Sequence, residues 1–492
     1  MRYLVVVNDP KEWSFPQPNV DVVAARVYLT HPSYSTLERV RVINLSKSLA
    51  YQKNGYYVSL LADARGHRPL PSVETIQNMK SQAVAALAGS DVQELIEKSL
   101  HGISSETFVL SVYFGRNTAQ RHNKLALALF QMFPCPYMQV HFTRIERTGR
   151  WRLDSLRPLA QGDIPETHLD FARESTEAYL TKSHNRTKPP GSCPYDLAIL
   201  IDPDTEDSPS NKKALQRFVK AGNEVGFNVE FVRQADYGRL AEFDALFIRT
   251  TTSVNHYTFR FACRAKALGI PVMDDPVSIL RCSNKVYLAE LAEQKDILVP
   301  DTMIVHRDNV RELEARLGLP CVLKIPDSAF SAGVVCVDST ETLLSTVDEM
   351  LKRSDLVIAQ GFIPTEFDWR IGILDGVPLF ACRYFMAPGH WQILKRDGKG
   401  KTEDVGNLET VPVEQAPTAV VKTALKAANH IGNGLYGVDL KEVGGKVYMI
   451  EVNDNPNIDA GLEDEVLGDE LYRRIMRSFL SRVVNRHLSG PS

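Results

Sequence analysis

The chain has 492 residues, of which 44% are hydrophobic and 24% are charged, and its formal net charge is −3 at pH 7. This length is enough for two to four domains, and the composition supports ordinary buried cores without a global signature of disorder. The near-neutral charge gives no reason to expect a nucleic-acid partner, and no apolar run approaches the roughly 20 residues that a membrane-spanning helix needs.

The cysteines and the N-terminus bear on the expected cellular location. The seven cysteines form no CxxC pair and no metal-ligand spacing, so we expect reduced thiols, each buried for structural reasons. The apolar run at the N-terminus ends at Asp9 and is too short for the core of a signal peptide. These patterns predict a cytoplasmic protein whose first apolar run is a buried strand.

The first part of the chain has the pattern of an α/β domain. After a strand over residues 3–7, apolar spacing predicts a helix over 37–53, and Gly55 then precedes a second strand over 57–61. The elements expected next are helices over 75–87 and 91–100, a strand over 107–114, a helix over 118–132 and a hairpin over 138–153. The run KSHNRTKPPGSCP at 182–194 has the composition of a linker, which predicts an accessory domain over 1–181.

A second alternation of strands and helices follows this linker. The elements expected here are strands over 197–201, 229–232, 245–249 and 271–273, and helices over 211–224 and 255–268. Gly269 at the end of the last helix and the strict alternation predict a small doubly wound domain over 195–283. From 284 to 485 the pattern changes to mixed α/β with strands that look antiparallel, which predicts a further domain.

Two lysines lie at positions where they could reach phosphate. Lys285 follows Asn284, directly after the last strand of the small domain. Lys324 lies in the apolar run CVLKI and is followed by a loop of small residues that contains Ser331 and Gly333. Such a loop lets backbone N–H groups approach phosphate oxygens, and a strand lysine can reach the same oxygens. The alternative is a lysine that extends from an edge strand to solvent, beside an ordinary turn.

The third signal is an apolar strand that ends in Gln360, Gly361 and Phe362. Asp368 and Arg370 come shortly after it. An apolar strand that runs into a short polar linker could hydrogen-bond a purine and its ribose. The alternative interpretation is a strand followed by a solvated, charged turn.

The strongest signal is a hairpin that carries acids inside apolar strands. Asp439 lies in the first strand, and Glu451 and Asn453 lie two residues apart in the second, so their side chains share one face. Two carboxylates and an amide oxygen are the hard ligands that Mg²⁺ takes when it bridges nucleotide phosphates. Buried acids need a compensating cation, and the alternative is that Lys or Arg supplies it.

The four signals in this order resemble the ATP-grasp fold and, within it, the RimK-type α-L-glutamate ligases, over about residues 197–480. The first 190 residues resemble the extra domain attached to some RimK-like ligases. The resemblance implies an N-terminal α/β domain, a small doubly wound pre-ATP-grasp domain and an α+β ATP-grasp domain. The sequence departs from the family at Asn284, where an Asp is usual, at Gly361, which replaces a Glu, and at Asn457, which replaces a Gly.

The resemblance also implies a role for each candidate residue. It assigns nucleotide contacts to nine residues: Lys285, Lys324, Ser331, Gly333, Gln360, Gly361, Phe362, Asp368 and Asn407. It assigns metal binding to Asp439, Glu451 and Asn453, and it places Arg370 and Arg383 near the transferred phosphoryl group. The cofactors that it implies are ATP and Mg²⁺, with two ions and with Mn²⁺ as a substitute.

These expectations describe an ATP-dependent carboxylate–amine ligase that works through an acyl phosphate. The resemblance favours glutamate or another amino acid as the carboxylate, and a peptide, a protein or a small amine as the acceptor. It further implies a homo-oligomer with no nucleic-acid or membrane partner. Two alternatives remain open: a phosphotransferase on the same fold, and a nucleotide-binding regulator without catalysis.

Overall fold

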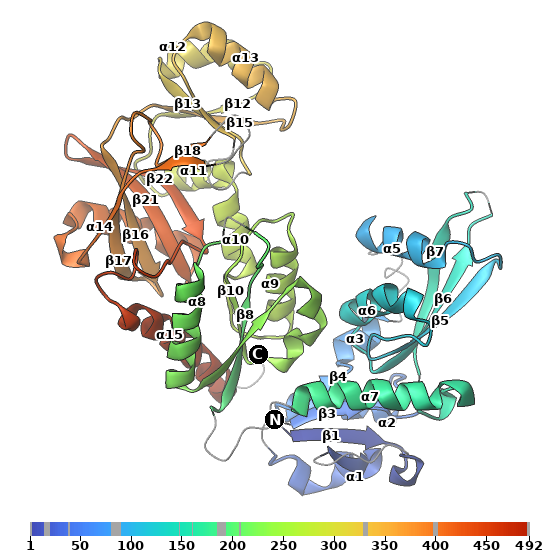
Figure 1. Cartoon of the computed structure of the whole chain (residues 1–492). Helices are drawn as coiled ribbons and strands as arrows, with labels where there is room; N and C mark the ends of the chain where they lie inside the picture. The colour runs from blue at the N-terminus through green and yellow to red at the C-terminus, as the bar shows by residue number, and fades with distance from the viewer. Residues whose placement is uncertain are drawn as a thin grey trace. The chain divides into compact units, whose positions relative to one another are not determined.

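The computed structural model describes residues 2–13, 20–37, 40–79, 90–146, 148–159, 161–184, 193–205, 208–327, 333–396 and 402–489. Contacts divide the chain into two compact units (Figure 1). The first unit contains residues 1–191 with 237–239 and 485–492, and the second contains 192–236 with 240–484. Helix α7 (Leu169–His184) extends into the range expected as a linker. Among the described residues, no helix combines the length and the apolar character needed to cross a membrane.

The first unit begins with a parallel four-stranded sheet in the order β2-β1-β3-β4. Its strands are β1 (Arg2–Val7), β2 (Val20–Ala24), β3 (Val40–Asn44) and β4 (Arg68–Leu70). Its helices are α1 (Ala25–Thr30), α2 (Asn54–Ala64) and α3 (Val73–Asn78). Strand β1 lies inside the sheet with Leu4, Val5 and Val6 buried, so the first apolar run is a core strand as predicted.

The structure corrects two predictions in this unit. Residues 37–53 were expected to form a helix, but Val40–Asn44 is strand β3. All five residues of β3 are buried, and a strand buried on both faces shows a continuous apolar run that a helical spacing also matches. Residues 57–61 were expected to form a strand, but they lie inside helix α2, which buries Val58 and Ala62 one turn apart.

An antiparallel sheet completes the first unit, with strand order β5-β6-β7. Its elements are α5 (Ser90–Leu100), β5 (Thr107–Tyr113), α6 (Asn123–Met132), β6 (Tyr137–Arg144) and β7 (Trp151–Pro158). These confirm the helix over 91–100, the strand over 107–114 and the hairpin. The helix expected over 118–132 begins only at Asn123, and of the helix expected over 75–87, residues 80–87 lie outside the described residues.

The second unit starts with a doubly wound parallel sheet in the order β11-β10-β8-β9, as the alternation predicts. Its strands are β8 (Tyr195–Leu200), β9 (Phe227–Val232), β10 (Ala245–Ile248) and β11 (Val272–Met273). Its helices are α8 (Lys212–Val225), α9 (Tyr257–Ala267) and α10 (Pro276–Ser283). Asn211 caps α8 by accepting a hydrogen bond from Ala214 N, and Gly226 ends that helix with a φ of 108°.

Besides the two-stranded sheet of β18 (Leu394–Arg396) and β19 (Thr402–Val405), two antiparallel sheets of four and five strands follow in the same unit, so the fold is mixed α/β, as expected. The smaller sheet has the order β12-β15-β13-β14, with β12 (Thr302–Val305), β13 (Cys321–Lys324), β14 (Val334–Val337) and β15 (Val357–Gly361). The larger has the order β20-β17-β16-β21-β22, with β16 (Phe367–Leu374), β17 (Val377–Phe385), β20 (Leu408–Val411), β21 (Leu435–Val443) and β22 (Lys446–Asp454). Helices α11 (Lys285–Gln294), α13 (Thr340–Met350), α14 (Thr418–Ile431) and α15 (Asp469–Ser489) accompany them.

The side chains of the large sheet alternate between its two faces, so the two faces pack against different parts of the unit. Ile371, Val438 and Val452 pack on one face with residues of α14. The residues one position away point to the other face, where the pairing places Arg370 opposite Asp439 and Asp439 opposite Glu451. The register of three neighbouring strands therefore gathers the charged residues on one face.

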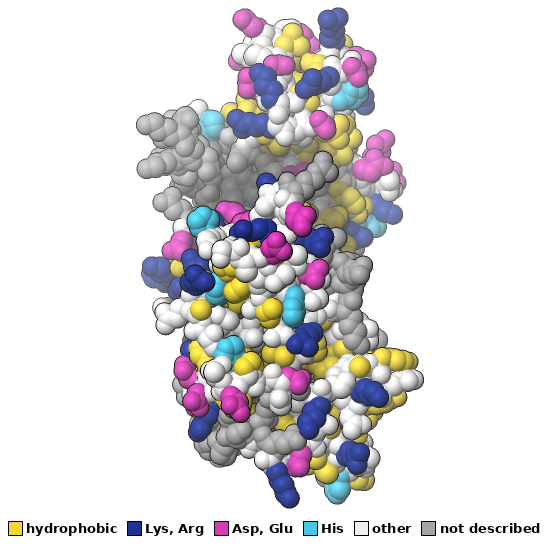
Figure 2. Space-filling model, turned by 90° about the vertical axis from the view of Figure 1, so that its right-hand side faces the viewer, with side chains coloured by type: hydrophobic (Ala, Val, Ile, Leu, Met, Phe, Trp, Pro, Cys, Tyr) yellow, Lys and Arg dark blue, Asp and Glu magenta, His cyan; other side chains and the backbone are white. Residues whose placement is uncertain are grey.

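The surface of the described residues agrees with the near-neutral charge. On the face shown in Figure 2, basic and acidic side chains are interspersed, and neither sign forms a continuous field among the residues that are coloured by type.

Candidate active site

A cavity of about 750 Å³ lies in the second unit and is lined by residues of both antiparallel sheets and of the doubly wound part. Eleven of the predicted site residues line it: Lys285, Lys324, Gln360, Gly361, Phe362, Asp368, Arg370, Asn407, Asp439, Glu451 and Asn453. A volume of this size is typical of a small-molecule or cofactor site. The structure thus brings together residues that are up to 168 positions apart in the sequence (285 to 453).

Lys285 is placed by the N-terminus of α11, where the Asn284 side chain caps the helix by accepting a hydrogen bond from Tyr287 N at 3.0 Å. The Lys285 ammonium lies 3.0 Å from Glu451 Oε1 on β22. Burial alone would raise the pKa of Glu451, but Lys285 and Lys324 outweigh it and lower that pKa below its ordinary value. Glu451 is therefore a carboxylate at neutral pH.

Lys324 ends strand β13 and points across the small sheet instead of to solvent. Its ammonium donates to Gln360 Oε1 at 2.6 Å, and Gln360 Nε2 donates in turn to Thr302 Oγ1 at 3.0 Å. Burial lowers the pKa of Lys324 to about 8. An ammonium whose partner here is a neutral amide is suited to meet a negatively charged ligand.

Arg370 on β16 and Asp439 on β21 form a bidentate ion pair. Arg370 Nε and Nη2 donate to the two Asp439 oxygens at 2.6 and 2.8 Å, and Asn453 Nδ2 donates to Asp439 Oδ2 at 3.0 Å. Burial would lower the pKa of Arg370, but the Asp439 charge outweighs this effect and raises it. Both acids predicted as metal ligands are therefore paired with cations in this structure.

The donor set still fits a hard cation. Asp439, Glu451 and Asn453 line the same cavity, and each carboxylate oxygen has a second lone pair. Asn453 uses its amide nitrogen toward Asp439, which leaves the amide oxygen as an acceptor. Among the described residues, no group of three or more His, Cys, Asp or Glu side chains could hold a metal ion. An ion at this place would thus need the amide oxygen and ligand oxygens to complete its shell.

Sequence reasoning missed Lys441, which also lines the cavity. Its ammonium donates to Asp368 Oδ1 and to Thr365 Oγ1, both at 2.6 Å. Burial raises the pKa of Asp368 despite this partner. A signal was present, because Lys441 lies two residues after Asp439 on the same strand and therefore on the same face.

Tyr384, Asp459 and Glu463 were missed as well, and they line the cavity beside Arg370. The Arg370 guanidinium lies 4.7 Å from the Tyr384 ring centroid, and Tyr384 donates its hydroxyl to Glu463 Oε1 at 2.5 Å. Glu463 Oε2 accepts from Asp459 N at 2.7 Å. Asp459 and Glu463 lie in the segment after β22, and the sequence there carries no periodic signal that would have indicated them.

Two acids with raised pKa values, Asp454 and Asp274, interact with one another at the cavity. Asp454 lines the cavity, and burial raises the pKa of Asp454 to about 7. Burial also raises the pKa of Asp274, which is 2% exposed and interacts with the charge of Asp454. One carboxylate oxygen of each is buried without a hydrogen-bond partner among the described residues. Asp454 directly follows Asn453, but the sequence pattern did not select it.

Three of the predicted site residues are not among the described residues that line the cavity. Arg383 does not line the cavity. It lies over the Trp369 ring at 5.0 Å and pairs with Glu409 at 3.1 Å, because it alternates with Tyr384 along β17 and so points to the opposite face. Gly333 has a φ of 74° and precedes the cavity residue Val334 without lining the cavity itself. Ser331 lies outside the described residues.

Comparisons with known proteins add to this geometry. Residues 25–175, within the first unit, match the family model described as RimK-like ATPgrasp N-terminal domain. A protein named probable alpha-L-glutamate ligase 1, from Pseudoalteromonas atlantica, is 27% identical over 229 residues, which are 46% of this chain and 72% of that protein. A probable alpha-L-glutamate ligase from Thioalkalivibrio sulfidiphilus is 26% identical over 252 residues, which are 50% of this chain and 79% of that protein.

The similar solved structures include a RimK domain ATP-grasp protein from Sphaerobacter thermophilus. It has 16% sequence identity and a TM-score of 0.45, and the match covers 57% of this chain and 98% of that one.

Proposed function

We propose that this chain, which is similar to a RimK-like ATP-grasp N-terminal domain and to proteins named as probable alpha-L-glutamate ligases, uses ATP to join a carboxylate to an amine. One observation carries the proposal: a single cavity combines Lys285, Lys324 and Arg370 with the oxygen donors Asp439, Glu451 and Asn453. Cations and hard oxygen ligands that line one cavity suit a nucleotide triphosphate with its metal ion.

The nucleotide would bind between the two antiparallel sheets. Lys285 and Lys324 are placed to neutralise its phosphates, and the strand end at Gln360–Phe362 is placed to contact the base. Gly361 offers only backbone groups there, because it has no side chain. Asp368, held by Lys441, is available to accept from the ribose hydroxyls. These assignments follow from the shared cavity and from the pattern of the family.

Asp439, Glu451 and Asn453 would hold Mg²⁺. The ion, when bound, neutralises charge on the phosphates and on the leaving ADP. Arg370 and Lys285 pair with the two acids of this set, so the two cations would exchange the acids for phosphate oxygens when the nucleotide binds. Arg370 would then become free to contact the transferred phosphoryl group, and Lys285 the remaining phosphates.

The chemistry requires two displacements. A carboxylate oxygen of the first substrate attacks the γ-phosphorus, and ADP leaves. The amine nitrogen of the second substrate attacks the acyl carbon, phosphate leaves with the bonding electrons, and the nitrogen loses one proton to give the amide. The protein contributes mainly positioning and charge compensation, which can supply most of the acceleration for such transfers.

We propose glutamate or another amino acid as the carboxylate, since two relatives are named as probable alpha-L-glutamate ligases. The acceptor would be an amine of a peptide, a protein or a small molecule. Tyr384, Asp459 and Glu463 line the cavity beside Arg370 and are positioned to shape the site for these substrates.

The test is the release of ADP and phosphate from Mg²⁺-ATP, measured with pairs of amino acids and amines, together with detection of the amide by mass spectrometry. Glu451→Gln should lose at least about 100-fold in turnover, because it removes a charge that neutralises and orients the metal site. Glu442→Gln is the matched control, since Glu442 lies exposed on the same hairpin.

The outcomes separate the alternatives. Release that needs both one acid and one amine, and that is lost only in Glu451→Gln, supports the ligase. ADP with a phosphorylated product and no amide would indicate a phosphotransferase instead. Equal release by Glu451→Gln and the parent chain would remove Glu451 from the site.

A further inference from the structure

A buried arginine outside the catalytic sheets holds the turn that follows the predicted metal ligands. Arg249, directly after β10, is 0% exposed. Its Nη1 donates to Asn455 Oδ1 at 2.7 Å and its Nη2 donates to Pro456 O at 3.0 Å. The same guanidinium donates to Ser210 Oγ and to Pro209 O. Burial lowers the pKa of Arg249 to about 10, so it remains charged at neutral pH.

The turn held by Arg249 is tightly constrained from its other sides. Asn455 has a φ of 48°, and its Nδ2 donates to Thr250 O at 2.7 Å. Pro456 lies against β21, where a Cβ added to Gly437 would come within 2.8 Å of the Pro456 Cβ. Only a glycine at this position leaves room for so close an approach. The turn thus has one position relative to the strand that carries Asp439.

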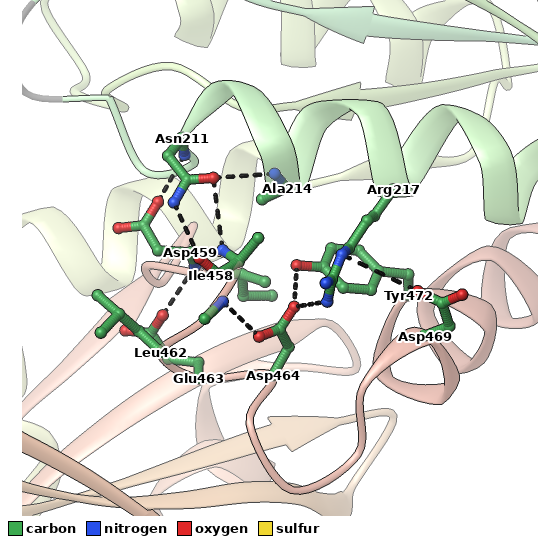
Figure 3. Close-up of polar contacts among 12 residues, drawn as sticks. Asn211, Ala214, Arg217, Ile458, Asp459, Leu462, Glu463, Asp464, Asp469 and Tyr472 are labelled. Atoms are coloured by element: carbon green, nitrogen blue, oxygen red, sulfur yellow. Dashed lines mark hydrogen bonds and ion pairs between the residues drawn. The ribbon is translucent and has the colours of Figure 1, made fainter.

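The segment beyond the turn is tied to the same part of the chain. Ile458 N donates to Pro209 O at 2.9 Å, and Ser210 Oγ donates to Ile458 O at 2.8 Å. Asn211 N donates to Asp459 Oδ1 at 2.5 Å at the start of α8, as Figure 3 shows. Arg249 therefore lies at the centre of a junction between the end of β10, the segment before α8 and the turn after β22.

We propose that Arg249 is a positioning residue for the metal site: by fixing Asn455 and Pro456, it sets the direction in which Asn453 presents its amide oxygen to the cavity. Asn453 lies opposite Gly437 in the pairing of β22 with β21, and Pro456, which Arg249 holds, closes against the same Gly437. Arg249 uses Nε, Nη1 and Nη2 together, and a planar guanidinium offers these donors in fixed directions, whereas an ammonium has fewer donors around a single nitrogen. The inference rests on the proposed function, because that function makes Asn453 a metal ligand.

The experiment uses Mn²⁺ and ADP as probes with the full chain, so no substrate has to be known. Free Mn²⁺ is measured by electron paramagnetic resonance in the presence of ADP, and metal-free ADP binding is measured by calorimetry with EDTA. Asn455→Gly removes both side-chain bonds but accepts a φ of 48°. Asp296→Gly is the matched control, because Asp296 is exposed, has a φ of 49° and does not line the cavity.

We expect Asn455→Gly to weaken Mn²⁺ binding to the ADP complex by about 10-fold to 100-fold, as loss of an outer partner of a metal ligand does. Asn455 lines the cavity, but its side chain is bonded to Arg249 and to Thr250 O, and the turn does not hold the lysines, so metal-free ADP binding should remain within about twofold of the parent chain. Arg249→Lys, which keeps the charge but loses the planar donors, should show the same selective loss. Asp296→Gly should match the parent chain in both measurements.

Three results would overturn the inference. The first is an Mn²⁺ affinity unchanged in Asn455→Gly. The second is an equal loss of Mn²⁺ binding and of metal-free ADP binding in both Asn455→Gly and Arg249→Lys, which would show general damage to the fold. The third is a parent chain that binds ADP but no Mn²⁺, which would overturn the proposed metal site and this inference with it.

Discussion

At the scale of residues, most of the charged side chains named in the cavity are arranged in ion pairs. Lys285 pairs with Glu451, Arg370 with Asp439 and Lys441 with Asp368, at 2.6 to 3.0 Å. Lys324 instead donates to the neutral amide of Gln360. A buried ammonium beside a neutral acceptor has a lowered pKa, and a polyphosphate would restore its charge. Lys324 should therefore make nucleotide binding sensitive to pH.

The first prediction concerns this pH dependence. Lys324 attracts phosphate only in its charged form, and burial lowers its pKa to about 8. The affinity for ADP should therefore fall as the pH rises from about 7 to about 9. The loss should approach tenfold per pH unit above the pKa. Lys324→Arg, which stays charged over this range, should flatten the profile. Calorimetric titrations with ADP at several pH values measure it, and a flat profile of the parent chain would contradict this role.

At the scale of elements, the segment between β22 and α15 is held to α8 by a buried carboxylate. Asp464 is 2% exposed and accepts from Arg217, from the Tyr472 hydroxyl at 2.7 Å and from Gly461 N at 2.7 Å (Figure 3). Arg217 also lies 3.9 Å from Asp469, which is more than one-third exposed. The same segment contains Asp459 and Glu463, which line the cavity. The contacts of Asp464 therefore help to hold these two residues in place.

The second prediction compares the two acids that face Arg217. Asp464→Asn should lower the free energy of unfolding by about 2 kcal/mol, because an amide nitrogen cannot accept from the Tyr472 hydroxyl or Arg217. Asp469→Asn should cost less than about 1 kcal/mol, because its ion pairs are exposed. Urea denaturation, followed in the transition that ADP shifts, compares them. Equal effects of the two variants would contradict a special role for Asp464.

At the scale of the whole molecule, the second unit has a core that crosses the boundary expected between residues 283 and 284. Helix α15 buries Tyr472, Ile475, Met476 and Phe479 in one cluster with residues of the doubly wound sheet and of the large antiparallel sheet. Phe479 lies 5.3 Å from Phe247 of β10 between ring centroids. These contacts place both ranges in one compact unit, which is how the chain divides by its contacts.

The third prediction follows from this shared core. Phe479→Ala should destabilise the second unit by about 3 to 5 kcal/mol, because it removes a fully buried ring. Ser481→Ala, at an exposed position of the same helix, should change stability by less than about 0.5 kcal/mol. Calorimetry of the parent chain should also show a single transition that ADP raises. Two separate transitions for residues 195–283 and 284–485 would contradict a common core.

Local patterns were enough for many elements and for most of the cavity. Glu451 and Asn453 could be placed on one face because strand side chains alternate, and the hairpin that carries them was visible from its turn. Strand β3 was predicted as a helix because its fully buried apolar run also fits a helical spacing, and part of helix α2 was predicted as a strand because its short apolar run fits both periodicities. The sequence did not show that Arg383 points away from the cavity, since a one-residue step along β17 turns a side chain to the opposite face.

The sequence by itself determined the chemistry of the chain: which residues carry charge, which runs are apolar and which motifs resemble those of ATP-grasp ligases. The tertiary structure decided the partners, such as Arg370 with Asp439, Lys441 with Asp368 and Arg249 with the turn at Asn455. The physical reason is distance along the chain. Periodicity acts over a few residues, whereas the last of these contacts joins residues separated by 206 positions, and only packing of the complete fold brings them together.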